Sequence, residues 1–344
     1  MQTTPKGMNR IFAIFALLAA TGAAIADEAK PPIRANSVQE CLELQCTELS
    51  IYPYEMDNLN GIETLASLEG LSVLSISSSK ITDISMIGSL KNLEFLNLSY
   101  TGVDDISVVS QLPKLERLHL SNTSLSDFEA LRDHPTLRDI RADGVKIDDL
   151  SPLSTLPRLE ELLMTNPKLS DLTALENVGT LQSVYFLPSS IEDISPLANL
   201  PNLRTVYICS HELTDLSPIA SAPMLSDLTL SCSALEDISG IDGMSSLTRI
   251  DFSGAGLTSV PETLALPSLE VAILDGTGIE NIDFLRNSPN LQALFISGTK
   301  VDDLAAVMKH EDLYDLRIDA EASTLMADQI ETLQARGVQV TAQP

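Results

Sequence analysis

The sequence predicts an α/β repeat solenoid: a curved array with a parallel concave β-sheet and short 3₁₀ or loop segments on its convex side. Three observations lead to this prediction. A leucine recurs every 22 residues, without insertion or deletion, from Leu71 to Leu313. The units share one set of apolar positions, and proline and aspartate recur at fixed places in their turns. Such self-similarity is typical of solenoids, in which stacked units share a continuous core.

Within a unit the apolar residues stand at positions 1, 4, 6, 11, 14, 17 and 20, counted from the recurring leucine. Residues 93–114 show this pattern with Leu93, Leu96, Leu98, Val103, Ile106, Val109 and Leu112. The spacing of two between positions 4 and 6 predicts a half-buried strand. The spacing of three from position 11 onward suits a 3₁₀-like segment. Because stacked units place equivalent strands side by side, we expect one parallel sheet.

The turns have their own recurring residues. Proline occupies position 21 in seven units, where it would end the convex segment: Pro113, Pro135, Pro157, Pro201, Pro223, Pro267 and Pro289. Aspartate occupies position 13 in nine units: Asp83, Asp105, Asp127, Asp149, Asp171, Asp193, Asp215, Asp237 and Asp303. Stacked carboxylates could bind calcium, but such short, regular loops favour nine separate turn caps. Position 9 is often Ser or Thr, whose hydroxyl can satisfy a backbone group at the bend.

The N-terminal end of the chain departs from the repeat. Residues 1–26 have the pattern of a secretory signal peptide, with Lys6 and Arg10 before an apolar run at 11–20 and a small-x-small cleavage site at 24–26. A transmembrane anchor is the alternative, but the run is shorter than a span of about 20 residues. We therefore expect a secreted or periplasmic protein that does not insert into a membrane.

The rest of the chain is predicted to be a repeat array between two caps. Residues 27–48 would form the N-terminal cap, and residues 49–312 would form twelve full repeats. The first repeat would open at Leu49, with Tyr52 and Tyr54 at its apolar positions 4 and 6. Residues 313–344 would hold a partial repeat and the C-terminal cap. In that cap, residues 323–336 predict an amphipathic helix that ends at Gly337, and residues 338–340 can add a last strand. The apolar side of that helix would carry Leu325, Ile330 and Leu333.

The chain is strongly acidic. It has 48 Asp and Glu against 21 Lys and Arg, and its formal net charge is −27. Cleavage after residue 26 would remove two positive charges and no negative charge, which gives about −29. Such a charge disfavours binding to nucleic acid and to anionic lipid, and it favours protein partners with basic patches.

Four cysteines in an exported chain suggest disulfides. Cys41 and Cys46 lie together in the predicted N-terminal cap, whereas Cys209 and Cys232 stand at positions 7 and 8 of adjacent repeats. Neighbouring strands would place the last two Cα atoms roughly 6 Å apart, inside the disulfide range, although adjacent positions point to opposite faces. The cap lies roughly 35 Å away, which excludes cross-pairing. We predict the pairs Cys41–Cys46 and Cys209–Cys232.

The units resemble the 22-residue leucine-rich repeat of the bacterial internalin type. The resemblance rests on the recurring leucines over residues 49–312 and on stretches such as Ile-Glu-Asp-Ile-Ser-Pro-Leu at 191–197. Position 9 departs from the family, because no unit has the usual asparagine there. The resemblance implies a curved scaffold that binds another protein on its concave face. We expect no immunoglobulin-like or surface-anchoring module after the repeats, and hence a soluble binding role.

Alternation along each strand would point positions 4 and 6 into the core and positions 3, 5 and 7 onto the concave surface. Position 5 of three adjacent units holds Leu163, Tyr185 and Tyr207, and Leu187 stands beside them at position 7. A contiguous apolar patch with tyrosines is typical of a protein interface. The alternative is that the rings only cover the sheet and stabilise it through cross-strand contacts. Ile273 and Phe295, in the same row, form a second candidate.

No catalytic, cofactor-binding or metal-binding residue is predicted. The sequence has no glycine-rich phosphate loop and no zinc-ligand spacing, and no two of its four histidines share a metal-ligand spacing: His119, His134, His211 and His310. His119 would lie on the concave face between Asn97 and Arg141. There it would make a polar contact of an interface, or be a solvated surface histidine.

These observations favour a secreted, non-enzymatic protein–protein recognition module, monomeric rather than homo-oligomeric, that binds its partner on the concave sheet. The alternative is a structural or envelope-associated scaffold whose sheet face covers a self-interface. The two differ in a measurable way, because the sedimentation of a self-associating scaffold would change with concentration.

Overall fold

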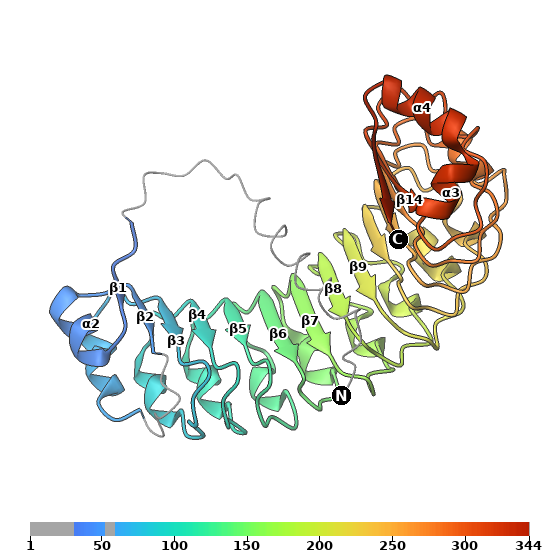
Figure 1. The fold of residues 1–344 in the computed structure, drawn as a ribbon. Helices are drawn as coiled ribbons and strands as arrows, with labels where there is room; N and C mark the ends of the chain where they lie inside the picture. The colour runs from blue at the N-terminus through green and yellow to red at the C-terminus, as the bar shows by residue number, and fades with distance from the viewer. Residues whose placement is uncertain (1–30, 52–58, 344) are drawn as a thin grey trace, which may run out of the picture.

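The chain winds into one curved solenoid, seen in a computed structural model that describes residues 31–51 and 59–343. Strands line the concave side of the curve and short 3₁₀ segments line the convex side (Figure 1). The predicted solenoid, with a parallel concave sheet and short convex segments, is confirmed. The predicted signal peptide at 1–26 and the apolar positions Tyr52 and Tyr54 of the first repeat lie outside the described residues.

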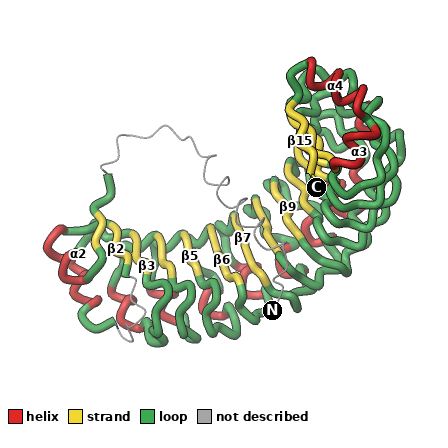
Figure 2. Tube along the Cα trace, in the orientation of Figure 1, coloured by secondary structure: helices red, strands yellow, loops and turns green. Residues whose placement is uncertain are grey.

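A single sheet follows the whole array (Figure 2). Its fifteen described strands follow one another in chain order, and each pairs in parallel with the next. A constant period keeps the register constant, so the backbone groups of each strand find partners in the next unit. The strands are β1 Arg34–Ala35, β2 Glu48–Ser50, β3 Val73–Ser75, β4 Phe95–Asn97, β5 Arg117–His119, β6 Asp139–Asp143, β7 Glu161–Thr165, β8 Ser183–Phe186, β9 Thr205–Ile208, β10 Asp227–Thr229, β11 Arg249–Asp251, β12 Val271–Ile273, β13 Ala293–Phe295, β14 Asp315–Asp319 and β15 Gln339–Gln343.

Ten 3₁₀ segments of the described chain form the convex side: Ile62–Ser67, Ser85–Ser89, Ser107–Gln111, Glu129–Leu131, Ser151–Thr155, Thr173–Leu175, Ser195–Leu197, Ser217–Ser221, Ser239–Ile241 and Asp283–Asn287. The predicted turn caps precede eight of these segments. In all nine units, the position-13 aspartate accepts a hydrogen bond from the backbone N–H two residues later, at 2.7–3.0 Å. The turn-cap interpretation of these aspartates is therefore confirmed.

The apolar positions of every unit meet in one continuous core. In residues 93–112 all seven of these side chains are at most 2% exposed. Position 20 is not apolar in every unit, because three units bury a polar residue there: His134, Ser288 and His310. The position-9 hydroxyls also behave as predicted. That of Thr101, for example, donates to the carbonyl oxygen of Leu98 at 2.6 Å.

The first repeat is longer than the sequence period indicates. Leu49 in β2 pairs with Leu74 in β3, which is position 4 of its unit. These residues are 25 apart, three more than the period, so the prediction that Leu49 opens the first repeat is wrong in register. Leucine occurs at both positions 1 and 4, and the period alone does not separate them. Ile51 then fills position 6, where it is 3% exposed, and Leu59 fills position 11.

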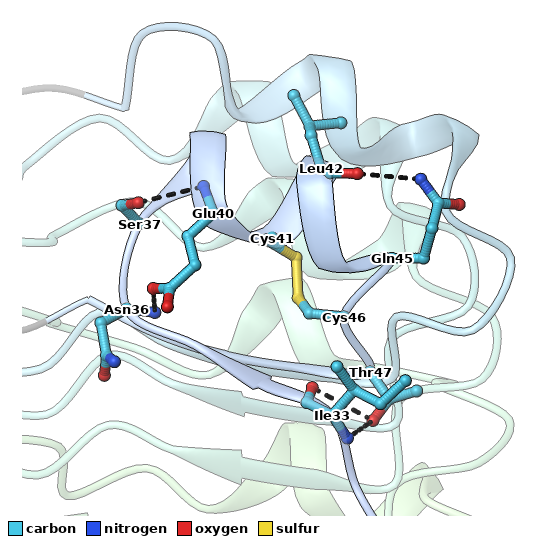
Figure 3. The surroundings of a disulfide bond; sticks show 9 residues. All are labelled: Ile33, Asn36, Ser37, Glu40, Cys41, Leu42, Gln45, Cys46 and Thr47. Carbon is cyan, nitrogen blue, oxygen red and sulfur yellow. Dashed lines mark hydrogen bonds between the residues drawn. A yellow bond between two sulfur atoms is a disulfide. The ribbon is translucent and has the colours of Figure 1, made fainter.

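Strand β1 and helix α2 (Val38–Leu44) form the predicted N-terminal cap, and β2 is the strand of the first repeat. The Ser37 side chain accepts a hydrogen bond from the backbone N–H of Glu40, and the Glu40 carboxylate accepts one from that of Asn36 (Figure 3). These bonds satisfy backbone donors at the start of a short helix. Cys41 and Cys46, both fully buried, form the predicted disulfide at the end of that helix.

The C-terminal cap contains two helices where the sequence predicts one. Helix α3 spans Ala320–Leu325 and helix α4 spans Ala327–Ala335, with a break at Met326. Met326 is buried at 3% exposure, whereas Leu325 is 72% exposed. The expectation that Leu325 belongs to the apolar side is therefore wrong, because the break turns Met326 into the core instead.

The end of α4 follows the predicted course. Gly337 has a φ of 94°, in the left-handed region. Its N–H donates to Gln334, and the N–H of Val338 donates to Leu333, which is the pattern of a glycine-terminated helix. Strand β15 then pairs with β14 over five residues, so the predicted last strand is present and longer than expected.

Candidate protein-binding surface

The first predicted surface lies on three neighbouring strands in the middle of the sheet. We call Leu163, Tyr185, Leu187 and Tyr207 the central patch. Leu163 pairs with Tyr185 and Tyr185 pairs with Tyr207 in the strand register. The two rings lie 6.3 Å apart between centroids at an interplanar angle of 34°. Both tyrosines and Leu187 are half-buried, whereas Leu163 is 7% exposed and largely covered.

The bend after the strand differs in the three units of the central patch. Position 8 has a left-handed backbone in eight other units: Ser78, Tyr100, Asn122, Gly144, Cys232, Gly254, Gly276 and Gly298. The units of the central patch have Asn166, Pro188 and Ser210 there instead, and none has a positive φ. Their strands β7, β8 and β9 have four or five residues, against three in most units. The sequence signals this change only through Pro167 and Pro188.

Carboxylates flank the central patch at position 3, a feature that the sequence reasoning missed. Glu161 lies on β7 and Asp227 lies on β10. Each is close to an arginine on its outer neighbouring strand, which is β6 for Glu161 and β11 for Asp227. Arg141 lies 4.0 Å from Glu161, and Arg249 lies 3.5 Å from Asp227. Burial raises the pKa of Asp227 to about 6. It also raises the pKa of Glu161, with a further contribution from the charge of Asp139.

Both arginines are shared with a second carboxylate. Arg141 lies 3.4 Å from Asp139, and Arg249 lies 3.4 Å from Asp251. Asp143 adds a fifth carboxylate to these four. Concave positions 3, 5 and 7 of strands β6 to β11 thus hold five carboxylates and two guanidinium groups. The surface around the tyrosines is negative, in agreement with the charge of the whole chain.

The second predicted surface is smaller than the first. Ile273 pairs with Phe295 on adjacent strands β12 and β13, so the structure brings the two together. Ile273 is only 9% exposed. The guanidinium of Arg317 lies 3.9 Å from the centroid of the Phe295 ring. This cation covers the aromatic face from within the chain, which leaves less apolar surface for a partner.

The predicted disulfide Cys209–Cys232 closes one edge of the central patch. Its Cα atoms lie 5.4 Å apart. Adjacent positions normally face opposite sides, but Cys232 has a left-handed backbone with a φ of 53°. This conformation redirects its side chain toward the preceding unit. Since Cys209 follows Tyr207 by two residues on the same face, the bond links the end of β9 to the next repeat.

The histidines do not form a common site. His119 lies on the concave face, 4.8 Å from the Phe95 ring centroid and 3.9 Å from Asp139. His134 and His310 are buried at position 20. In the described part of the chain, no group of three or more His, Cys, Asp or Glu residues could hold a metal ion. No described helix has the length and apolar character that a membrane crossing requires.

Comparison with known proteins supports the repeat architecture. The family described as Leucine Rich repeats (2 copies) matches residues 91–133. No curated protein matches the chain in sequence. Among solved structures, the internalin InlF of Listeria monocytogenes is similar with a TM-score of 0.72 at 24% identity, and the match covers 87% of each chain.

Two further solved structures are similar at lower identity. A leucine-rich-repeat protein of Leptospira interrogans has a TM-score of 0.59 at 15% identity, with 91% of this chain and 100% of that chain covered. The ectodomain of the Arabidopsis thaliana receptor kinase GASSHO1/SCHENGEN3, solved in complex with CASPARIAN STRIP INTEGRITY FACTOR 2, has a TM-score of 0.57 at 16% identity. That match covers 85% of this chain and 40% of the receptor chain. At these identities the likeness concerns the fold.

Proposed function

We propose that this chain, which has a leucine-rich-repeat solenoid fold like that of the internalin InlF, is a non-enzymatic recognition module that binds a protein through its central patch. The observation that carries the proposal is the pair Tyr185 and Tyr207, 6.3 Å apart and half-buried on the concave sheet. Tyrosines at the centre of a concave surface supply a large contact area with little conformational freedom to lose. In one structure of the same fold, the Arabidopsis receptor, a partner is bound.

We propose that the protein acts outside the cytoplasm. Two disulfides join all four cysteines, and disulfides persist mainly in oxidising compartments. The signal-peptide pattern of residues 1–26 leads in the same direction. The partner is then a protein of the cell envelope or of another cell's surface, rather than a cytoplasmic protein.

Capture of the partner tests the proposal. The purified protein and a Tyr185→Asp/Tyr207→Asp variant would be immobilised and exposed to extracts of bacterial envelope and of eukaryotic cell surface. The proposal expects a protein that the wild type retains and the variant loses, identified by mass spectrometry. The substitutions would place two carboxylates against the apolar surface of the partner, and the loss of their hydration would oppose binding.

A matched control is available because two other tyrosines lie far from the central patch. Tyr100 and Tyr314 are 61% and 57% exposed, so a Tyr100→Asp/Tyr314→Asp variant carries the same charge change elsewhere. That control should retain the partner. If both double variants bind equally well, the central patch is not the interface, and an Ile273→Asp/Phe295→Asp variant tests the second surface. A sedimentation coefficient that rises with protein concentration would favour the self-associating scaffold instead.

A further inference from the structure

A row of small residues two strands wide lies beside the tyrosines of the central patch, and we call this row the notch. Position 3 of their two strands holds small hydroxyl residues, Ser183 and Thr205, whereas the strands on either side hold Glu161 and Asp227. These carboxylates are three strand spacings apart, about 14 Å. The notch is therefore a row of two small side chains with a carboxylate-bearing residue at each end, and Tyr185 and Tyr207 stand beside it at position 5.

The charges that face the notch are negative. Arg141 and Arg249 contact the carboxylates from strands β6 and β11, on the sides away from the tyrosines. Each also contacts a second carboxylate, Asp139 or Asp251, so neither neutralises its partner fully. Burial raises the pKa of Tyr185, a hydrogen bond with Ser183 lowers it, and the charges of Glu161 and Asp227 raise it.

A cationic group fits this arrangement better than the other common interface groups. Glu161 and Asp227 each share their arginine with another carboxylate, and that arginine lies on the side away from the notch. The two carboxylates therefore still attract a further positive charge. Aromatic rings beside them attract a cation through their faces. An acidic group would be repelled from both ends, and a purely apolar group would remove more water from the two carboxylates without any compensating charge.

We propose that the notch between Glu161 and Asp227 receives a lysine or arginine side chain of the partner protein, while the adjoining apolar part of the partner covers Tyr185 and Tyr207. The proposal rests on the proposed function and specifies its partner as a segment with a basic residue beside apolar residues. A charged head in the notch lies between the two carboxylates and is attracted by both, and its aliphatic stem lies along the tyrosine row.

A displayed library of random 12-residue peptides is the probe. It would be selected in parallel against the wild type and a Glu161→Gln/Asp227→Asn variant, in which amides replace the carboxylates at nearly equal volume. Wild-type selection should enrich lysine and arginine next to apolar residues, and the amide variant should lose that enrichment. One enriched peptide, synthesised and measured by calorimetry, should bind the variant about tenfold more weakly. Replacement of its basic residue by norleucine should weaken binding to the wild type but not to the variant.

An Asp104→Asn/Glu192→Gln variant is the matched control, because it removes the same number of charges from exposed position-12 sites. It should enrich the same basic peptides as the wild type. Enrichment that persists in the Glu161→Gln/Asp227→Asn variant would show that the net charge of the chain selects the peptides, and would overturn the notch proposal. Peptides that depend on Tyr185 and Tyr207 but carry no basic residue would also overturn it, while leaving the proposed function intact. Peptides indifferent to both tyrosines would instead contradict the proposed function.

Discussion

At the scale of the residue, position 20 shows how a core position tolerates a polar side chain. Most units have an apolar residue there, but His134 is 3% exposed and neither ring nitrogen forms a hydrogen bond with a described residue. His310 differs, because its Nε2 lies 2.9 Å from the carbonyl oxygen of Leu285. A buried polar group without a partner destabilises the folded state, so the two histidines should differ in effect.

We expect His134→Leu to stabilise the protein by about 1 kcal/mol at neutral pH and by more at pH 5. Burial lowers the pKa of His134, against a smaller opposing effect of the Val109 and Leu112 carbonyls. The folded state then binds fewer protons than the unfolded chain, so the free energy of unfolding falls as pH drops below the unfolded pKa of about 6.5. Thermal unfolding of both proteins at pH 5 and pH 8 measures this. An equal difference in Tm at the two pH values would contradict the assigned role of His134.

At the scale of the element, the bend after the strand depends in eight units on one left-handed residue at position 8. Gly254 has a φ of 67° there, and an added Cβ would meet no atom within 4 Å. Any loss of stability in Gly254→Ala would thus come from the backbone conformation alone, and we expect about 1 kcal/mol. Gly179 is the control, since its φ is not in the left-handed region and a Cβ would lie 3.8 Å from Pro201. Chemical denaturation should find Gly179→Ala unchanged or slightly more stable. Similar losses in both variants would contradict this account.

The elements also show what the sequence could predict. The 22-residue period predicted the strands, the convex segments and the core positions, because each follows from repetition of one local pattern. The longer strands β7 to β9 and the break at Met326 depend on contacts that a single unit does not contain. For the candidate site, the tyrosine row could be predicted from alternation along the strands. The burial of Leu163 and the pairing of Glu161 and Asp227 with outer arginines depend on side-chain packing between units, and the period carries no information about that.

At the scale of the whole molecule, a local loss of stability should spread only from one repeat to the adjacent repeats. Each strand pairs with the strands before and after it, and the sheet has no other connection among the described residues. The folding of such an array approximates a chain of units coupled to their nearest neighbours. The ends then matter most, because a terminal unit has one stabilising interface instead of two, and the N-terminal end is closed by the cap with Cys41 and Cys46.

Removal of that disulfide should therefore loosen the array from its N-terminal end. In a Cys41→Ala/Cys46→Ala variant, we expect faster amide hydrogen exchange in β2 to β4, declining with distance, and no change in β12 to β14. A Cys209→Ala/Cys232→Ala variant should instead accelerate exchange around β9 and β10, because that bond links two interior repeats. Its global cost should be the larger one, about 3 kcal/mol against about 2 kcal/mol, because it closes the longer loop. Uniform acceleration along the array in both variants would mean that the solenoid unfolds as one cooperative unit.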